Sequence, residues 1–148
     1  MAIPLNVPGA NGSASEPAKK TRRTLAGLRV LLAEDVEMVR DLITILLARE
    51  MMTVTAVTDG AAAVAAVEAE DYDLVILDVQ MPIMGGIEAS KRIRASGGHG
   101  ETVPILALTG NVLRRDIAQC HAAGMDGHVP KPFTTEALIN TIKSVLGE

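Results

Sequence analysis

The chain has 148 residues, 48% of them apolar but with one Tyr, one Phe and no Trp, which is enough for one domain with an aliphatic core. The net charge is −4, and residues 25–148 alone carry −7, which argues against a nucleic-acid binder. A single cysteine, Cys120, excludes an internal disulfide. The chain has no membrane span of roughly 20 apolar residues and no apolar signal core, so we predict a soluble, cytoplasmic protein.

Residues 1–24 are rich in Pro, Gly, Ser and Ala and carry a net charge of +3. They hold too little apolar surface to offset the entropy of ordering, so we predict a disordered basic N-terminal tail. The basic stretch 19–23 is a candidate contact for an acidic partner, but a solubilising leader is the simpler interpretation. The N-terminal Met and the tail suggest a whole protein with one domain, residues 25–148.

Five apolar stretches alternate with five helical patterns along the rest of the chain. The predicted strands are 29–33, 52–57, 74–80, 105–108 and 126–129. The predicted helices are 36–50, 61–70, 86–95, 114–123 and a last one that begins at Thr134 or Thr135 and runs through Leu146. Short continuous apolar runs are typical of strands buried on both faces, as in a parallel sheet with right-handed crossovers. Asp59 is placed to cap the second helix, and Gly124 to end the fourth in the left-handed region.

The first predicted helix has two kinds of apolar position. Its buried stripe follows three- and four-residue steps and consists of Val39, Leu42, Ile43, Leu46 and Leu47. Three further apolar residues fall outside this stripe: Val36, Met38 and Ile45. Exposed apolar groups near polar strand ends suggest a surface for a partner protein, although a few scattered exposed side chains would need no function.

Polar side chains follow the predicted strands at the points where the strands end. Glu34 and Asp35 come after the first strand, Asp78 ends the apolar part of the third, and Thr109 follows the fourth. The fifth strand is followed by Lys131 and a proline. Because ligands of open α/β sheets collect at the carboxyl ends of the strands, we expect these side chains to converge on one edge of the sheet, here called the rim.

With these motifs the chain closely resembles the receiver domain of two-component response regulators. The matching residues are Glu34-Asp35, Asp78 within DVQMP, Thr109 within ALTG and Lys131 within KPF, with steps of 43, 31 and 22 residues from Asp35 onward. The resemblance covers roughly residues 27–147. It implies an α/β fold, a doubly wound flavodoxin-like (βα)5 three-layer sandwich with parallel sheet order 2-1-3-4-5, which the alternation alone would not fix. It also implies a cis peptide bond at Pro132.

The resemblance implies a phospho-accepting response regulator in a two-component phosphorelay. Asp78 would accept a phosphoryl group from a phosphohistidine of a histidine kinase or a histidine phosphotransfer protein, with Thr109 and Lys131 contacting that group. The expected Mg²⁺ ligands are Asp35, Asp78, the backbone carbonyl of Gln80 and, through water, Glu34. Three carboxylates on one rim repel one another, which favours a bound cation over a purely structural role.

The same resemblance limits what else the chain does. We expect it to catalyse only its own phosphorylation and dephosphorylation, and to switch the face formed by the fourth helix, fifth strand and fifth helix for a downstream protein target. We expect a monomer or weak dimer that binds no nucleic acid and inserts into no membrane.

The chain departs from the family's pattern at two places. Gly85-Gly86 stands where Asp-Gly is common, which removes a loop charge. His128 stands three residues before the lysine, where receivers usually have a Tyr or Phe ring that swings inward. We therefore predict that the switch depends on Thr109 and the loop 110–112, with His128 following passively.

Four other interpretations compete with this one. A degenerate receiver that is never phosphorylated would lack part of the matched residue set, which is complete here. An aspartyl-phosphate hydrolase would carry a second Asp two residues after the nucleophile, where this chain has Gln80. A flavin or nucleotide binder would need a Gly-rich phosphate loop where Glu34 and Asp35 would repel phosphate. A receiver excised from a hybrid histidine kinase would share every motif described above, so this alternative stays open.

Overall fold

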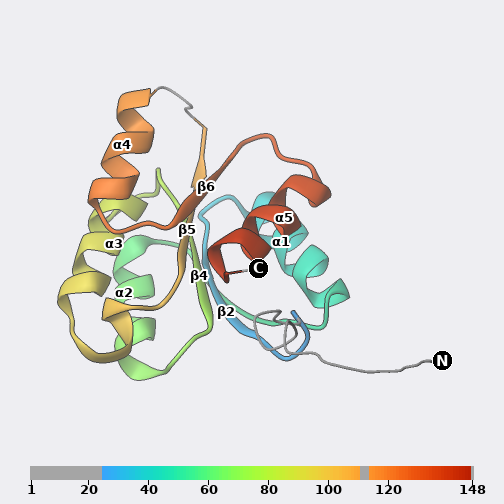
Figure 1. Ribbon diagram of the computed structural model, residues 1–148, viewed down its shortest axis with the longest axis horizontal. Coiled ribbons are helices and arrows are strands. Elements are labelled where there is room, and N and C mark those ends of the chain that lie inside the picture. The colour runs from blue at the N-terminus through green and yellow to red at the C-terminus, as the bar shows by residue number, and fades with distance from the viewer. Residues whose placement is uncertain (1–24, 111–113, 148) are drawn as a thin grey trace.

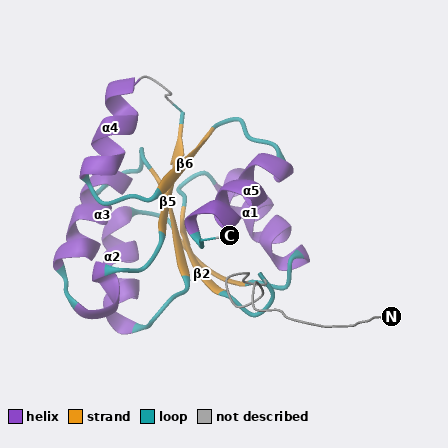
Figure 2. Cartoon of the chain, viewed as in Figure 1, coloured by secondary structure: helices purple, strands orange, loops and turns teal. Residues whose placement is uncertain are grey.

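The computed structural model describes residues 25–110 and 114–147, in which a parallel sheet lies between two layers of helices (Figures 1 and 2). The strands are β2 (Arg29–Ala33), β3 (Thr53–Val57), β4 (Leu74–Asp78), β5 (Ile105–Thr109) and β6 (Gly127–Pro130). The helices are α1 (Glu37–Arg49), α2 (Gly60–Ala69), α3 (Gly86–Ala95), α4 (Arg114–Ala122) and α5 (Thr135–Val145), with the 3-10 turn η3 (Gly98–Glu101) after α3. The predicted tail and residues 111–113 lie outside the described residues.

The strand order is β3-β2-β4-β5-β6, and every neighbouring pair is parallel. In chain order this is 2-1-3-4-5, so the predicted doubly wound three-layer architecture is confirmed. Since all five strands run in one direction, their carboxyl ends share one edge of the sheet, and the segments after β2, β4, β5 and β6 meet there.

Two apolar clusters hold the helices to the two faces of the sheet. Successive strand residues point to opposite faces, so Leu32 joins the cluster under α1 and α5 while Leu31 joins the one under α2, α3 and α4. The first cluster includes Ile43, Leu47, Leu106, Leu138 and Ile142. The second includes Ala63, Val67, Val75, Ile93 and Cys120. Both are almost entirely aliphatic, as the composition requires.

The ends of the helices follow the predicted capping pattern. The side chain of Asp59 accepts a hydrogen bond from the amide of Ala62 at 2.8 Å, and Thr134 accepts one from Ala137 at 3.0 Å. Gly124 ends α4 with φ of 93°, as predicted. Met51 takes the same left-handed role after α1, with φ of 68°, although Gly or Asn is more usual there.

The prediction that Leu42 of α1 lies in the core is wrong. Leu42 is 48% exposed, and Val39 is only partly buried. The inward face of α1 is centred on the fully buried Ile43 and Leu47, so a residue at the margin of the predicted stripe faces solvent. Leu42 instead joins Met38 and Ile45 of α1 and the preceding residue Val36 as an exposed apolar side chain. These four residues are called the α1 patch below.

Arg94 of α3 contacts the edge of the sheet opposite the rim, where β5 and β6 begin. Its guanidinium donates to three backbone carbonyls, those of Gly100, Val103 and Gly124. It also pairs with Asp126 at 3.0 Å, and the same carboxylate oxygen accepts a hydrogen bond from the amide of Ile105 at 2.9 Å. α3 is thereby tied to the amino ends of both strands.

Among the described residues, no helix is long and apolar enough to cross a membrane.

Candidate functional site

Three carboxylates meet at the rim. Glu34 and Asp35 follow β2, and Asp78 is the last residue of the central strand β4. One oxygen from each of the three lies within 4.8 Å of the others. Glu34 is fully buried and Asp78 is 4% exposed, whereas Asp35 faces solvent. The predicted convergence of the acidic residues is therefore confirmed.

Lys131 joins the two buried carboxylates. Its Nζ lies 2.9 Å from Oδ2 of Asp78 and 3.0 Å from Oε1 of Glu34. The Lys131–Pro132 peptide bond is cis, as predicted, and the backbone N–H of Lys131 donates to the carbonyl of Thr109 at 2.7 Å. The lysine thus reaches back over the sheet edge and pairs with both Asp78 and Glu34.

These contacts change the protonation equilibria of both partners. Burial alone lowers the pKa of the Lys131 ammonium, but its hydrogen bonds to Asp78 and Glu34 outweigh burial and raise that pKa above the ordinary value. Burial raises the pKa of Glu34, against the lowering effect of its hydrogen bonds from Val36 and Lys131. The rim therefore contains a firmly protonated cation and an anion that is costly to keep buried without a positive partner.

Backbone and arginine donors position the acidic residues. The amide of Val36 donates to Oε2 of Glu34 at 3.0 Å, and the amide of Gln80 donates to Oδ1 of Asp78 at 3.2 Å. From the second turn of α1, Arg40 donates to the carbonyl of Glu34 at 3.0 Å. The carboxylates of Glu34 and Asp78 are thereby each held by a backbone amide as well as by Lys131.

Thr109 completes the rim. It is the last residue of β5, is 4% exposed and lies opposite Pro130 in the register of β5 and β6. Leu108, directly before it, lies opposite Asp78 in the register with β4. Thr109, which carries the predicted hydroxyl, therefore lies one residue beyond the partner of Asp78 on the neighbouring strand β5, at the same edge of the sheet.

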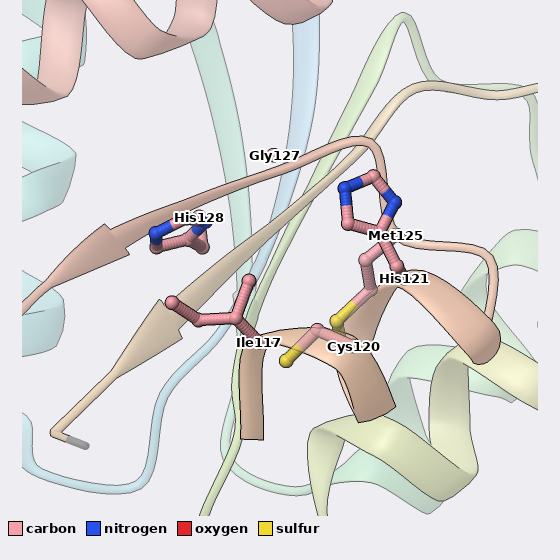
Figure 3. A pocket seen from close by; sticks show the side chains of 6 residues that line it. All are labelled: Ile117, Cys120, His121, Met125, Gly127 and His128. Carbon is pink, nitrogen blue, oxygen red and sulfur yellow. The ribbon is translucent and has the colours of Figure 1, made fainter. Parts of the chain in front are cut away.

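His128 lies on β6, next to a small hollow beside α4 (Figure 3). The hollow measures about 10 Å³ and is lined by Ile117, Cys120, His121, Met125, Gly127 and His128. His128 is thus one wall of this hollow, between β6 and α4. Burial, together with the nearby Asp116, raises the pKa of the Cys120 thiol.

Residues 30–143 match the family described as the response regulator receiver domain. The chain belongs to this receiver family.

Solved receiver structures share this fold. The receiver domain of sensor histidine kinase PA1611 from Pseudomonas aeruginosa, which has a magnesium ion coordinated in its active site cleft, is 36% identical with a TM-score of 0.77. That comparison covers 83% of this chain and 100% of the other. The chemotaxis response regulator CheY4 of Vibrio cholerae is 30% identical with a TM-score of 0.77, over 81% of this chain and 99% of CheY4.

Similar receivers occur within longer proteins. Histidine kinase 1 of Arabidopsis thaliana is 33% identical over 85% of this chain but only 13% of its own length. The sensory transduction protein RegX3 of Mycobacterium tuberculosis is 35% identical over 79% of this chain and 50% of its own length. The chain therefore spans half or less of these relatives and corresponds to their receiver part, a signalling module of two-component phosphorelays.

Several features of the receiver site escaped sequence reasoning. The Glu34–Lys131 ion pair depends on the long side chain of Glu34 and on the path of the chain after β6, and no local pattern encodes it. Arg40 was overlooked because an arginine on an exposed helix turn usually indicates only solvation. The predicted role of the Gln80 carbonyl stays a prediction, since the observed contact of Gln80 is its N–H to Asp78.

Proposed function

We propose that Asp78 is the phosphoacceptor of this receiver. The observation that carries the proposal is the position of its carboxylate, which is almost buried at the end of the central strand. It lies 2.9 Å from Lys131 and within 4.8 Å of the oxygens of Glu34 and Asp35. A positioned carboxylate is an established nucleophile in phosphoryl transfer, where positioning and charge stabilisation provide most of the rate.

The proposed reaction is a transfer between two side chains. A carboxylate oxygen of Asp78 attacks the phosphorus of a phosphohistidine, so that a P–O bond forms and the P–N bond breaks. The electron pair of the P–N bond stays on the imidazole nitrogen of the donor. Lys131 then balances charge on a phosphoryl oxygen, and the hydroxyl of Thr109 donates to another. In dephosphorylation, water attacks the phosphorus and releases inorganic phosphate with the free Asp78 carboxylate. Outside this cycle we expect no enzymatic reaction.

The rim residues fit a magnesium ion. Mg²⁺ prefers hard oxygen ligands, and the three grouped carboxylates supply them. Asp35 and Asp78 would hold the ion directly and Glu34 through water, with the backbone carbonyl of Gln80 as a further ligand. Bound Mg²⁺ would supply positive charge for the phosphoryl oxygens and offset the repulsion among the carboxylates.

Labelling of the native chain tests the proposal. Incubation with acetyl phosphate and Mg²⁺ should increase the intact mass by one phosphoryl group, and an excess of chelator should prevent the increase. The labelled chain should lose phosphate on alkaline treatment, as an acyl phosphate does. A stable modification, or labelling that does not need Mg²⁺, would contradict the assignment.

Receivers act with histidine kinases and histidine phosphotransfer proteins, and sensor kinases such as CqsS of Vibrio cholerae are among the relatives. We further propose that the α1 patch is where the phosphodonor protein docks. α1 starts two residues after Asp35, and Met38 in its first turn is 81% exposed. A helical bundle that packs on this patch would bring its phosphohistidine close to Asp78.

The substitution Met38→Glu should slow phosphotransfer from a protein donor about tenfold, because it places a charge where an apolar contact is lost. Labelling by acetyl phosphate should not change, and the two rates can be compared by autoradiography. Met51→Glu is a matched control, since Met51 is 70% exposed at the far end of α1. Equal slowing with both donors would indicate damage to the chemistry or the fold.

We propose that output from this receiver does not depend on a swinging side chain at position 128. An imidazole is smaller than a phenol ring and more costly to bury when charged, so its inward state is less favoured and movement of Thr109 would come first. His128→Ala should therefore retain phosphorylation-dependent binding of the downstream target, measured by titration with and without beryllofluoride. Loss of that dependence in a variant that is still phosphorylated at Asp78 would show that the imidazole is the moving part.

A cytoplasmic location, a monomeric or weakly dimeric state and the boundary between residues 24 and 25 stay predictions. The net charge of −7 on residues 25–148 supports a protein partner over a nucleic acid.

A further inference from the structure

The guanidinium of Arg40 binds the turn that carries two of the three rim carboxylates. Its Nη1 donates to the carbonyl of Glu34 at 3.0 Å and, over a longer distance, to the carbonyl of Asp35 at 3.4 Å. Arg40 forms no salt bridge among the described residues, so the contacts of its guanidinium there are with backbone oxygens. An arginine of α1 thus reaches back to the residues that follow β2.

These contacts fix the orientation of two peptide groups. Because a trans peptide is planar, its N–H points away from its C=O. The carbonyls of Glu34 and Asp35 are turned toward Arg40, so the N–H groups of the same two peptides point to the other side of the turn. In the second of these peptides, the N–H of Val36 donates to Oε2 of Glu34 at 3.0 Å. Arg40 therefore holds the peptide group that in turn holds the Glu34 carboxylate.

The turn from β2 into α1 lacks the side-chain cap that other helices of the fold have. α2 and α5 begin after Asp59 and Thr134, and each of these side chains accepts a hydrogen bond from the first turn of its helix. The N-cap of α1 is Val36, whose side chain makes no such bond. Asp35 and Val36 are also exposed, so packing does little to fix them. The hydrogen bonds from Arg40 take the place of the missing cap.

We propose that Arg40 is a positioning residue for magnesium binding, which keeps the side chains of Glu34 and Asp35 directed toward Asp78. This inference rests on the proposed function, in which these carboxylates bind Mg²⁺. One oxygen from each of the three lies within 4.8 Å of the others. Mg²⁺ requires a nearly ideal octahedron with ligands at about 2.0–2.1 Å, so a small displacement of the turn weakens its binding.

The sign of the effect separates positioning from charge. A guanidinium near the rim repels a cation, so loss of the Arg40 charge alone would make Mg²⁺ bind more tightly. Loss of the two hydrogen bonds would instead let the turn adopt more conformations, and the carboxylates would then have to be ordered when the ion binds. A weaker affinity for Mg²⁺ in a variant that lacks the charge therefore identifies positioning as the role of Arg40.

The substitution Arg40→Met tests the inference, because it keeps a long side chain and removes both the charge and the donors. The dissociation constant of Mg²⁺, measured by isothermal titration calorimetry on the unphosphorylated chain, should rise about fivefold. The Mg²⁺ concentration for half-maximal labelling by acetyl phosphate should rise with it. The labelling rate at saturating Mg²⁺ should stay within about twofold of native, because Arg40 does not touch the reacting atoms.

Two further variants serve as controls. Arg49→Met removes the same charge from an exposed position at the last residue of α1, and it should leave the affinity for Mg²⁺ within about twofold of native. Arg40→Lys keeps the charge, and because one nitrogen of Arg40 serves both carbonyls, the lysine ammonium should restore most of the lost affinity. If circular dichroism shows that Arg40→Met is unfolded, Arg40→Gln, which loses the charge and shortens the reach, replaces it.

Each outcome decides the inference. Mg²⁺ binding that is unchanged or tighter in Arg40→Met overturns it, and so does equal weakening in Arg49→Met. A lower labelling rate at saturating Mg²⁺ with an unchanged half-maximal concentration also overturns it, since Arg40 would then act in the chemistry. A failure of the proposed function is distinguishable, because the native chain would then bind Mg²⁺ without being labelled, or would bind none.

Discussion

A chain with Asp78→Asn should accept no phosphoryl group from acetyl phosphate or from a phosphohistidine protein. The amide is close in shape to the carboxylate and keeps an oxygen for the hydrogen bond from Gln80, so the fold should persist. It lacks the negative charge and free lone pair of the nucleophile, and labelling should fall to background. Intact-mass measurement with and without Mg²⁺ gives the result directly.

The matched control for this substitution is Asp71→Asn, which changes an exposed aspartate just before β4 begins, at the edge opposite the rim. This variant should be labelled as the native chain is. In metal-free buffer the Asp78→Asn chain should unfold at nearly the same denaturant concentration as native, because the loss of the ion pair with Lys131 is offset by one charge fewer among three neighbouring carboxylates. Labelling that persists in the Asn variant would move the phosphoacceptor to another residue.

The second large effect concerns stability. Lys131→Met should lower the free energy of unfolding by about 3 kcal/mol in metal-free buffer, since it leaves two buried carboxylates without their cation. Protonation of Glu34, whose pKa burial already raises, keeps the loss from being greater. Urea denaturation followed by circular dichroism measures the change.

Magnesium should stabilise the Lys131→Met chain more than the native chain, because no ammonium group competes for the rim. A ligand that binds the folded state more tightly raises the free energy of unfolding by more. Lys143→Met, at an exposed position near the end of α5, is the control and should change stability by less than about 0.5 kcal/mol. If the two lysine variants behave alike, the ion pairs of Lys131 contribute little to the free energy of folding.

Most of the fold could be predicted because its signals are local. Each strand is a short apolar run that ends in a polar residue, and the helix ends carry side chains such as Asp59 and Thr134 that cap them. The order of the strands is not local, and it came from the resemblance of the rim motifs to a known family. Leu42 was misassigned because helical periodicity indicates which residues share a face but not how wide a stripe the sheet covers.

The composition of the site was easier to predict than its contacts. Residues at strand ends converge whenever the sheet is parallel, so Glu34, Asp35 and Asp78 follow from topology. The pairing of Lys131 with Glu34 depends on three-dimensional distances between segments almost a hundred residues apart. The left-handed conformation of Ile83 contradicts the preference of its own side chain, and only the contacts of its loop with α2 and β4 explain it.

The interaction of Arg94 with Asp126 determines how the sheet can deform. It fixes the amino ends of β5 and β6 to α3, whereas the rim lies at their carboxyl ends. A displacement that starts at Thr109 therefore acts on a pair of strands clamped at the far end. We expect the displacement to be taken up at the rim, where the amide of Lys131 is bonded to the carbonyl of Thr109, and to leave the amino ends of the strands in place.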